Sequence, residues 1–250
     1  MVLQYLPNAW YNLYQGKIKL PNEDKNFYAG HRERLREKFV DNKLTDYEKL
    51  ELLLAYAIPR RDVRPLARAL INHFGGVYQV ITAPIDGLIA FNGIGRNTVV
   101  LIKLVQQMMQ IGYIGQIKNK PIFYDEKALY NYCRITLSGK QVEEFHVLYL
   151  DGDLKLIADV MHTVGTINRS AVYPREIARR ALELNARSIV MVHNHPTSIN
   201  SFSKDDVEIT IETESILNSL NITLYDHLLV ASDMVHSMRA SHLLDTMSKK

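Results

Sequence analysis

The hydrophobic pattern in the first half of the chain is typical of short helices. Apolar residues recur at helical spacing in three segments, which predict helices over residues 32–42, 46–58 and 63–74. Pro59 separates the second segment from the third, and the Gly75-Gly76 pair ends the third. Residues before about position 31 show no sustained periodicity. We therefore expect an irregular tail over residues 1–30 and a small all-α domain over residues 31–111.

The second half alternates strand-like and helix-like segments. Short apolar runs predict strands, and longer segments with helical spacing predict the helices between them. In chain order we expect a helix over 125–136, strands over 145–150 and 154–161, a helix over 174–185, a strand over 188–192, a helix over 204–220, and strands over 222–230 and 234–238. This order predicts an α/β domain, a mixed sheet with flanking helices, over residues 122–247. The polar, glycine-containing segment 112–121 is the expected linker.

Residue types that ligate metals follow the apolar run 188–192. Residues two apart in an extended strand project to the same side, so His193 and His195 can converge on one ion. The loop after Pro196 is long enough to bring Asp206 back from the start of the next helix. Imidazole and carboxylate both suit Zn²⁺, and three protein ligands with one open position are typical of a catalytic zinc site.

Each part of this pattern also has a purely structural interpretation. His-x-His occurs on many strands that bind no metal. Ser203-x-x-Asp206 also fits a helix cap, with Ser203 at the N-cap and Asp206 near the positive end of the helix dipole. Because both signals lie together at the end of one apolar strand, their combination favours the metal site.

The same segment resembles the metal motif of the JAB/MPN (JAMM) zinc metalloproteases, and its surroundings resemble their bacterial RadC-type branch. The resemblance spans about residues 121–244 and is carried by residues 143–151, 165–168, 174–177, 193–196, 203–206 and 226–227. It implies the JAB/MPN fold, a sandwich like that of the cytidine deaminases. One departure is the loop 197–202, where this branch commonly has Ser-Gly-Asp-Pro after His-Pro and this chain has Thr-Ser-Ile-Asn-Ser-Phe.

The resemblance implies that His193, His195 and Asp206 hold Zn²⁺ and that Ser203 helps to hold the site and the oxyanion. It also implies an upstream glutamate that contacts the attacking water. Glu143 aligns best with that residue and Glu144 is the alternative, although strand alternation lets only one of them face the metal. The implied activity is hydrolysis of a peptide or isopeptide bond. Zinc lowers the pKa of water from about 15.7 to near 7, and the glutamate acts as general base.

Residues 89–102 resemble the helix-hairpin-helix element of DNA-binding and repair proteins. Gly93-Ile94-Gly95-Arg96 separates two helix-like segments, and the N–H groups at the start of the second helix can bind a phosphate. The alternative function is therefore that of a RadC-type DNA repair protein that binds DNA weakly and non-specifically, with a non-catalytic zinc site. The same hairpin fits a tight turn with Ile94 in the core. For Asp226-His227 there are two interpretations: His227 supports the ligands or contacts the substrate, or the pair bonds its own backbone at a strand entry. We favour the strand-entry pair.

Composition removes several other classes of protein. The chain has 250 residues, a net charge of +3 and one cysteine. A zinc deaminase needs Pro-Cys-x-x-Cys, which a single cysteine cannot supply. One cysteine also predicts a reducing compartment. We see neither a signal-peptide pattern nor the run of about 18 apolar residues that spans a bilayer, so we expect a cytoplasmic protein without membrane association. The pattern predicts neither the identity of the substrate nor the oligomeric state.

Overall fold

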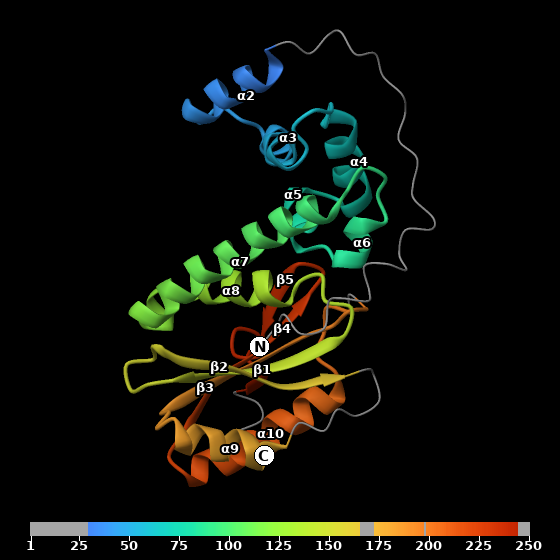
Figure 1. Ribbon diagram of the computed structural model, residues 1–250. Helices are drawn as coiled ribbons and strands as arrows, with labels where there is room; N and C mark the ends of the chain where they lie inside the picture. Colours follow the sequence, from blue (N-terminus) through green and yellow to red (C-terminus); the bar gives the residue numbers. More distant parts are fainter. Residues whose placement is uncertain (1–29, 166–172, 198, 245–250) are drawn as a thin grey trace. The chain divides into compact units, whose positions relative to one another are not determined.

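The structure is a computed structural model that describes residues 30–165, 173–197 and 199–244 (Figure 1). The expected N-terminal tail lies outside these residues except for Gly30, and so do residues 166–168 of the RadC-like stretches. The chain divides into two compact units, the first ending at Gln107 and the second beginning at Met108. Each unit has its own hydrophobic core.

The first unit is helical, as the apolar spacing predicts. Its described elements are α2 (His31–Val40), α3 (Asp46–Ala57), α4 (Arg64–Phe74), α5 (Val77–Thr82), α6 (Ile85–Ile89) and the beginning of α7 (Arg96–Asn119). Helix α3 begins with a capping box in which Thr45 and Glu48 each bond the other's backbone N–H. Helix α4 ends at Gly75, whose φ of +96° is the left-handed conformation that glycine adopts without strain. Apolar side chains from α3, α4 and α7 form one core.

The expected linker over residues 112–121 is wrong for most of its length. Helix α7 continues without interruption to Asn119, and only the last two residues of the segment leave it. Ile117 is buried in the core of the second unit, against which Tyr113 and Ile114 also pack. The burial of Ile117 and the packing of the partly buried Tyr113 and Ile114 offset the helix cost of Gly112 and Gly115, which is about 1 kcal/mol each relative to alanine.

The second unit is the predicted α/β sandwich. Its strands are β1 (Glu143–Leu150), β2 (Leu156–Gly165), β3 (Ser188–Asn194), β4 (Thr223–Ala231) and β5 (Met234–Ser237), in the sheet order β2-β1-β3-β4-β5. The sheet is mixed, because β3 and β4 are parallel while the other neighbours are antiparallel. Its helices are η1 (Ile122–Tyr124), α8 (Glu126–Leu137), α9 (Pro174–Glu183) and α10 (Lys204–Ser219).

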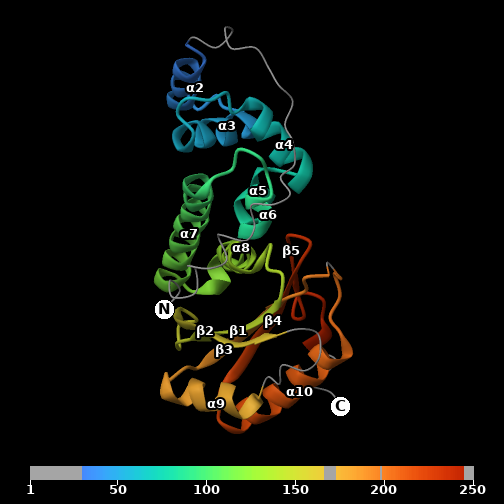
Figure 2. The same ribbon diagram turned by 45° about the vertical axis from the view of Figure 1, so that its right-hand side comes forward.

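Helices cover both faces of this sheet (Figures 1 and 2). Leu148, Val190 and Val192 point into the core beneath α8. Val147 and Met191 point to the other face, into the core beneath α9 and α10. Strand β3 lies between β1 and β4 and is buried along its whole length, which explains its unbroken apolar sequence. Strand alternation therefore continues from Met191 to His193 on the α10 face.

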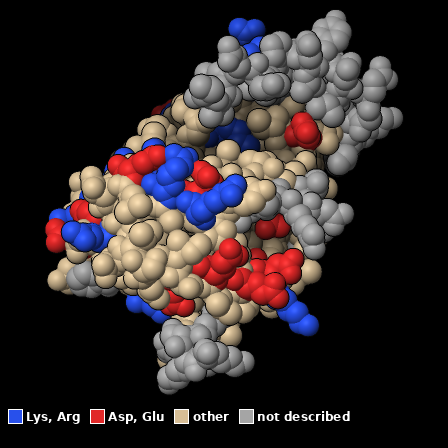
Figure 3. Space-filling view, turned by 90° about the horizontal axis from the view of Figure 1, so that it is seen from below, with Lys and Arg blue, Asp and Glu red and all other residues tan. Residues whose placement is uncertain are grey.

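The outer surface of α9 carries charges of both signs. Figure 3 looks onto the side of the second unit where α9 and α10 lie, and blue and red side chains lie beside each other there. Arg179 pairs with Glu176 and Glu183, and Arg180 also pairs with Glu183. Both glutamates of α9 pair with arginines, so its surface has mixed charge and lacks the single-sign basic character that nucleic-acid binding favours. No helix among the described residues is long and apolar enough to cross a membrane.

Candidate metal centre

Three side chains from separate elements meet at the carboxyl end of β3. His193 lies at the end of the strand and is fully buried, His195 follows it, and Asp206 comes from the first turn of α10. Each offers one ligand atom, and these atoms all lie within 4.8 Å of one another. The structure therefore brings together the three residues that the sequence predicted as ligands.

The spacing of these atoms fits zinc. Bonds of about 2.0–2.1 Å at tetrahedral angles place neighbouring ligand atoms about 3.3 Å apart. Nε2 of His193 lies 3.2 Å from Nε2 of His195 and 3.2 Å from Oδ1 of Asp206. Nε2 of His195 lies 3.6 Å from Oδ2 of Asp206. The three contacts are thus close to the edges of one face of a tetrahedron, and the fourth corner has no protein ligand from this group.

The backbone fixes which nitrogen of His195 faces this group. Its Nδ1 lies 3.0 Å from the carbonyl oxygen of Ile199. A carbonyl oxygen only accepts, so Nδ1 carries the proton, and in the neutral ring Nε2 presents a lone pair to His193 and Asp206. The hydrogen bond with Asp206 raises the pKa of His195, and the negative charge of Glu143 raises it further. Proton and metal therefore compete for the same nitrogen.

Asp206 is held by the cap of α10. Its Oδ2 accepts hydrogen bonds from the Ser203 N–H at 2.6 Å and from the Ser203 hydroxyl at 2.8 Å. Burial raises the pKa of Asp206, but the hydrogen bonds with His193 and His195 outweigh burial and hold that pKa well below its ordinary value. The helix cap is therefore present, and it is compatible with the metal-site interpretation because it holds the Asp206 carboxylate beside the two histidines.

The two candidate glutamates lie on opposite faces of β1. In the pairing of β1 with β3, Phe145 lies opposite His193, so Glu143 shares the face of the histidines. Glu143 is half-buried and its charge acts on His195. The Glu144 side chain instead contacts Lys140 at 2.9 Å and His146 at 3.4 Å, on the α8 face. The alternation supports Glu143 over Glu144, and the role of Glu143 as base stays a prediction.

Asn194, the middle residue of His-x-His, holds the strand that carries Glu143. Its Oδ1 accepts a hydrogen bond from the Glu144 N–H at 2.9 Å, and its Nδ2 donates to the Val142 carbonyl at 3.1 Å. These two backbone groups flank Glu143 on either side. The Asn194 side chain is thus a two-point clamp on the start of β1.

Two further side chains near the ligands were not identified from the sequence as part of the site. His227 is fully buried on β4, with Nε2 3.0 Å from Nδ1 of His193 and Nδ1 2.7 Å from the hydroxyl of Thr210 on α10. Burial lowers the pKa of His227 well below its ordinary value, so the ring is neutral. The predicted backbone bond of its neighbour is present, since Asp226 accepts from the His227 N–H at 2.7 Å. That interpretation missed the contact with His193.

A second polar cluster lies on the α8 face of the sheet. Nδ1 of His146 lies 2.9 Å from Asp159 Oδ1, and Tyr132 donates to Asp159 Oδ2 at 2.5 Å. Burial lowers the pKa of His146, but its bonds to Asp159 and Glu144 outweigh burial and raise that pKa to about 9. His146 is therefore an imidazolium between the carboxylates of Asp159 and Glu144.

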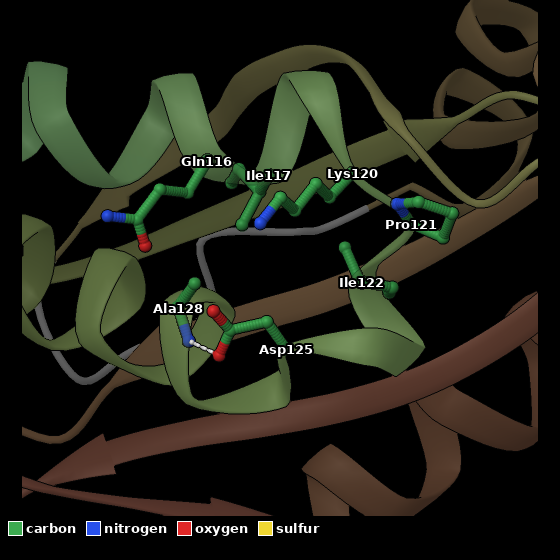
Figure 4. A pocket seen from close by; sticks show the side chains of 7 residues that line it. All are labelled: Gln116, Ile117, Lys120, Pro121, Ile122, Asp125 and Ala128. Carbon is green, nitrogen blue, oxygen red and sulfur yellow. Dashed lines mark hydrogen bonds between the residues drawn. The ribbon is translucent and has the colours of Figure 1, made fainter.

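The single cysteine and the best-defined cavity lie away from the ligands. Cys133 is buried in α8, and burial raises the pKa of its thiol well above the ordinary value. A cavity of about 320 Å³ opens where α7 ends and α8 begins (Figure 4); its lining residues are Gln116, Ile117, Lys120, Pro121, Ile122, Asp125 and Ala128. One oxygen of Asp125 accepts from the Ala128 N–H at 3.0 Å, so this carboxylate caps α8. The cavity shares no residue with the metal group.

Comparison with known proteins agrees with this architecture. Residues 123–243 match the family model of the RadC-like JAB domain. A UPF0758 protein of Ruegeria pomeroyi is 38% identical over 222 residues, which cover 88% of this chain and 99% of the relative. A UPF0758 protein of Fusobacterium nucleatum is 36% identical over 225 residues, which cover 86% of this chain and 97% of the relative. The chain therefore belongs to the RadC-like family, and its second unit is a JAB domain.

Proposed function

We propose that this protein is a zinc-dependent hydrolase of peptide or isopeptide bonds. One observation carries the proposal: three ligand atoms lie at the edge lengths of a zinc tetrahedron, and a half-buried glutamate shares their face of the sheet. A structural zinc site normally closes with four protein ligands, whereas catalytic sites keep one position open. The relationship to JAB domains supports the same chemistry, although the names of the relatives state no activity.

Each residue of the centre has a separate role in this proposal. His193, His195 and Asp206 hold the ion, which when bound supplies a Lewis acid for water and for the scissile carbonyl. Glu143 takes the proton of the attacking water on its carboxylate and passes it to the leaving amine. Ser203 holds Asp206 through its hydroxyl. Its additional contact with the substrate oxyanion, which the family resemblance implies, stays a prediction.

Metal analysis and a cleavage screen test the proposal together. Purified protein should contain about one zinc per chain, and His193→Ala and Asp206→Ala should lose it. A library of peptides and isopeptides should be cleaved by the wild type and not by Glu143→Gln, which keeps the ligands. Glu144→Gln, on the other face of the same strand, is the matched control and should keep activity. Undiminished zinc in both ligand variants, or equal cleavage by Glu143→Gln and wild type, contradicts the proposal.

The competing hypothesis, non-specific DNA binding through the first unit, has weaker support. Gly93 has a φ of +95°, Ile94 is buried in the core of the unit, and Arg96 begins α7. These features account for the hairpin as a packed turn between helices. The hypothesis predicts that the full chain binds duplex DNA with an affinity that falls steeply with salt. Fluorescence anisotropy at several salt concentrations measures this, and a signal that does not change with added DNA removes the hypothesis.

A further inference from the structure

A continuous chain of buried polar groups runs from α10 to the ligand group. Thr210 lies one turn after Asp206 on α10, and its hydroxyl contacts the Asp206 carbonyl oxygen. The same hydroxyl contacts Nδ1 of His227, and Nε2 of His227 contacts Nδ1 of His193. The side chains of all three linking residues, Thr210, His227 and His193, are fully buried. Every proton in the chain must therefore be shared among these groups.

The order of donors and acceptors in this row of hydrogen bonds follows from the Asp206 carbonyl oxygen at its end. The Asp206 carbonyl oxygen can only accept, and threonine inside a helix commonly donates its single hydroxyl proton to the carbonyl four residues earlier. The Thr210 oxygen then accepts, so the proton between Thr210 and His227 belongs to Nδ1 of His227. A neutral imidazole with a proton on Nδ1 has a bare Nε2, which accepts from Nδ1–H of His193.

The last step reaches the metal centre. With its Nδ1–H directed to His227, His193 turns Nε2 toward His195 and Asp206. We propose that Thr210 and His227 are positioning residues that hold His193 in the tautomer able to bind a metal through Nε2. This inference rests on the metal site of the proposed function. It gives α10 two contributions to that site, the ligand Asp206 and, one turn later, the hydroxyl that orients a second ligand.

The surrounding rings strengthen this arrangement. Phe145 stacks on His193 with ring centroids 6.0 Å apart, and Phe202 lies 5.4 Å from His227. Apolar walls on these sides reduce the access of water to the imidazole nitrogens, so the protein groups determine the tautomer. Ligating histidines usually donate their second N–H to a carboxylate, a carbonyl or water. Here another imidazole accepts that proton, and a hydroxyl supports it.

Nitrogen NMR of the metal-free full chain tests the tautomers directly. In protein labelled with ¹⁵N at histidine, protonated and bare ring nitrogens have different chemical shifts. We expect His193 and His227 both to carry the proton on Nδ1 at neutral pH. A ring of His193 without a proton on Nδ1 overturns the proposal, because the chain requires that nitrogen to donate to His227. This measurement needs neither zinc nor substrate, so a failure to detect hydrolysis leaves it unaffected.

Variants then separate positioning from packing. Thr210→Val keeps the shape and removes the hydroxyl, whereas Thr210→Ser keeps the hydroxyl. We expect Thr210→Val to populate both tautomers of His193 and to bind zinc about 10- to 100-fold more weakly in competition with a chromophoric chelator, and Thr210→Ser to restore both properties. Thr213→Val is the matched control, because Thr213 is also buried on α10 and its hydroxyl has no hydrogen-bond partner among the described residues.

The same logic applies to His227. The amide oxygen of His227→Gln can still accept from Nδ1–H of His193, whereas His227→Phe fills the space without an acceptor. We expect His227→Gln to keep more of the zinc affinity than His227→Phe, at equal helix content by circular dichroism. If both Thr210→Val and His227→Phe keep the wild-type tautomers and the wild-type zinc affinity, Thr210 and His227 contribute only packing and the proposal is overturned.

Discussion

The hydroxyl of Ser203 lies 2.8 Å from Oδ2 of Asp206, so the residue that caps α10 also holds a carboxylate of the candidate metal centre. This one hydrogen bond thus belongs both to the helix cap and to the support of the proposed ligand. Removing the hydroxyl should therefore change both the stability of the fold and the affinity for metal. A second capping box is formed by Thr45 and Glu48 at the start of α3, and neither residue belongs to the metal-ligating group found among the described residues. The two caps form a matched pair.

Ser203→Ala should lower stability and zinc affinity, and Thr45→Ala should lower stability alone. Loss of an N-cap costs about 1 kcal/mol in either case. Loss of a group that orients a ligand costs roughly 10-fold or more in metal affinity. Urea denaturation and chelator competition measure the two effects. Equal zinc affinity in the two variants would show that the cap does not orient Asp206.

The buried imidazolium at His146 makes stability depend on pH. Its pKa is about 9 in the folded protein, against about 6.5 in the unfolded chain. A group whose pKa is raised on folding stabilises fully below its unfolded pKa, and the contribution is lost as pH rises through its folded pKa. Stability should therefore fall by up to about 3 kcal/mol between pH 6.5 and 9.5.

Urea denaturation at several pH values measures this slope. His146→Gln should be less stable at pH 6.5 and should lose less stability than the wild type as the pH rises. An identical slope in the two proteins would assign the pH dependence to other groups.

The adjacent glutamates of β1 should respond oppositely to substitution. Glu144→Gln removes a counter-charge from Lys140 and His146, so it should destabilise the fold by about 1–3 kcal/mol and leave zinc content unchanged. Glu143→Gln should change stability by no more than about 0.5 kcal/mol, while turnover is lost. Denaturation and zinc analysis of both variants, at the same pH, give the comparison. If Glu143→Gln were the more destabilised variant, the assignment of Glu143 rather than Glu144 to the ligand group would be contradicted.

The two glycines of the hairpin should differ in their tolerance of alanine. Gly93 has a φ of +95°, and an added Cβ would clash with the guanidinium group of Arg61. The left-handed conformation alone costs a non-glycine residue about 1–2 kcal/mol, so Gly93→Ala should be destabilising. An added Cβ at Gly95 meets nothing within 4 Å, and Gly95→Ala should be nearly neutral. Thermal denaturation distinguishes the two, and equal effects would contradict this account of the turn.

The clamp of Asn194 on β1 predicts a selective loss of turnover. Asn194→Ala removes its bonds to the Glu144 N–H and the Val142 carbonyl, while His193 and His195 keep their own contacts. If Glu143 is the base, kcat should fall about 10-fold or more with zinc content unchanged, because a small misplacement of a catalytic group is costly. A variant that loses zinc before it loses turnover would show that Asn194 supports the ligands instead.

Local rules predicted the centre because its key residues obey them. His193 and His195 share a face through strand alternation, and Asp206 lies in a first helical turn that Ser203 marks. The contact of His227 with His193 depends on the parallel pairing of β3 with β4, in which Met191 lies opposite His227. That register joins residues 34 positions apart and leaves no local pattern. The nearest signal was the Asp226-His227 pair itself, which is one of the stretches that carry the family resemblance.

The segment 112–121 shows why local composition failed elsewhere. Glycine and polar residues suggested a linker, but Ile117, Tyr113 and Ile114 pack into the core of the second unit and keep α7 helical. Tertiary packing of one helix face commonly outweighs intrinsic propensity. The hydrophobic residues in the segment were visible in the sequence, whereas the surface that they cover was not.

The Asn194 clamp means that the three letters of His-Asn-His do not act as two ligands and a spacer. The two histidines lie on the α10 face of the sheet. Asn194, between them, hydrogen-bonds the backbone of the neighbouring strand β1, which carries Glu143. A designer who grafted only the histidine spacing onto another scaffold would transfer an ion-binding geometry without the carboxylate beside it. Such a graft would also need the asparagine and the neighbouring strand to which it is hydrogen-bonded.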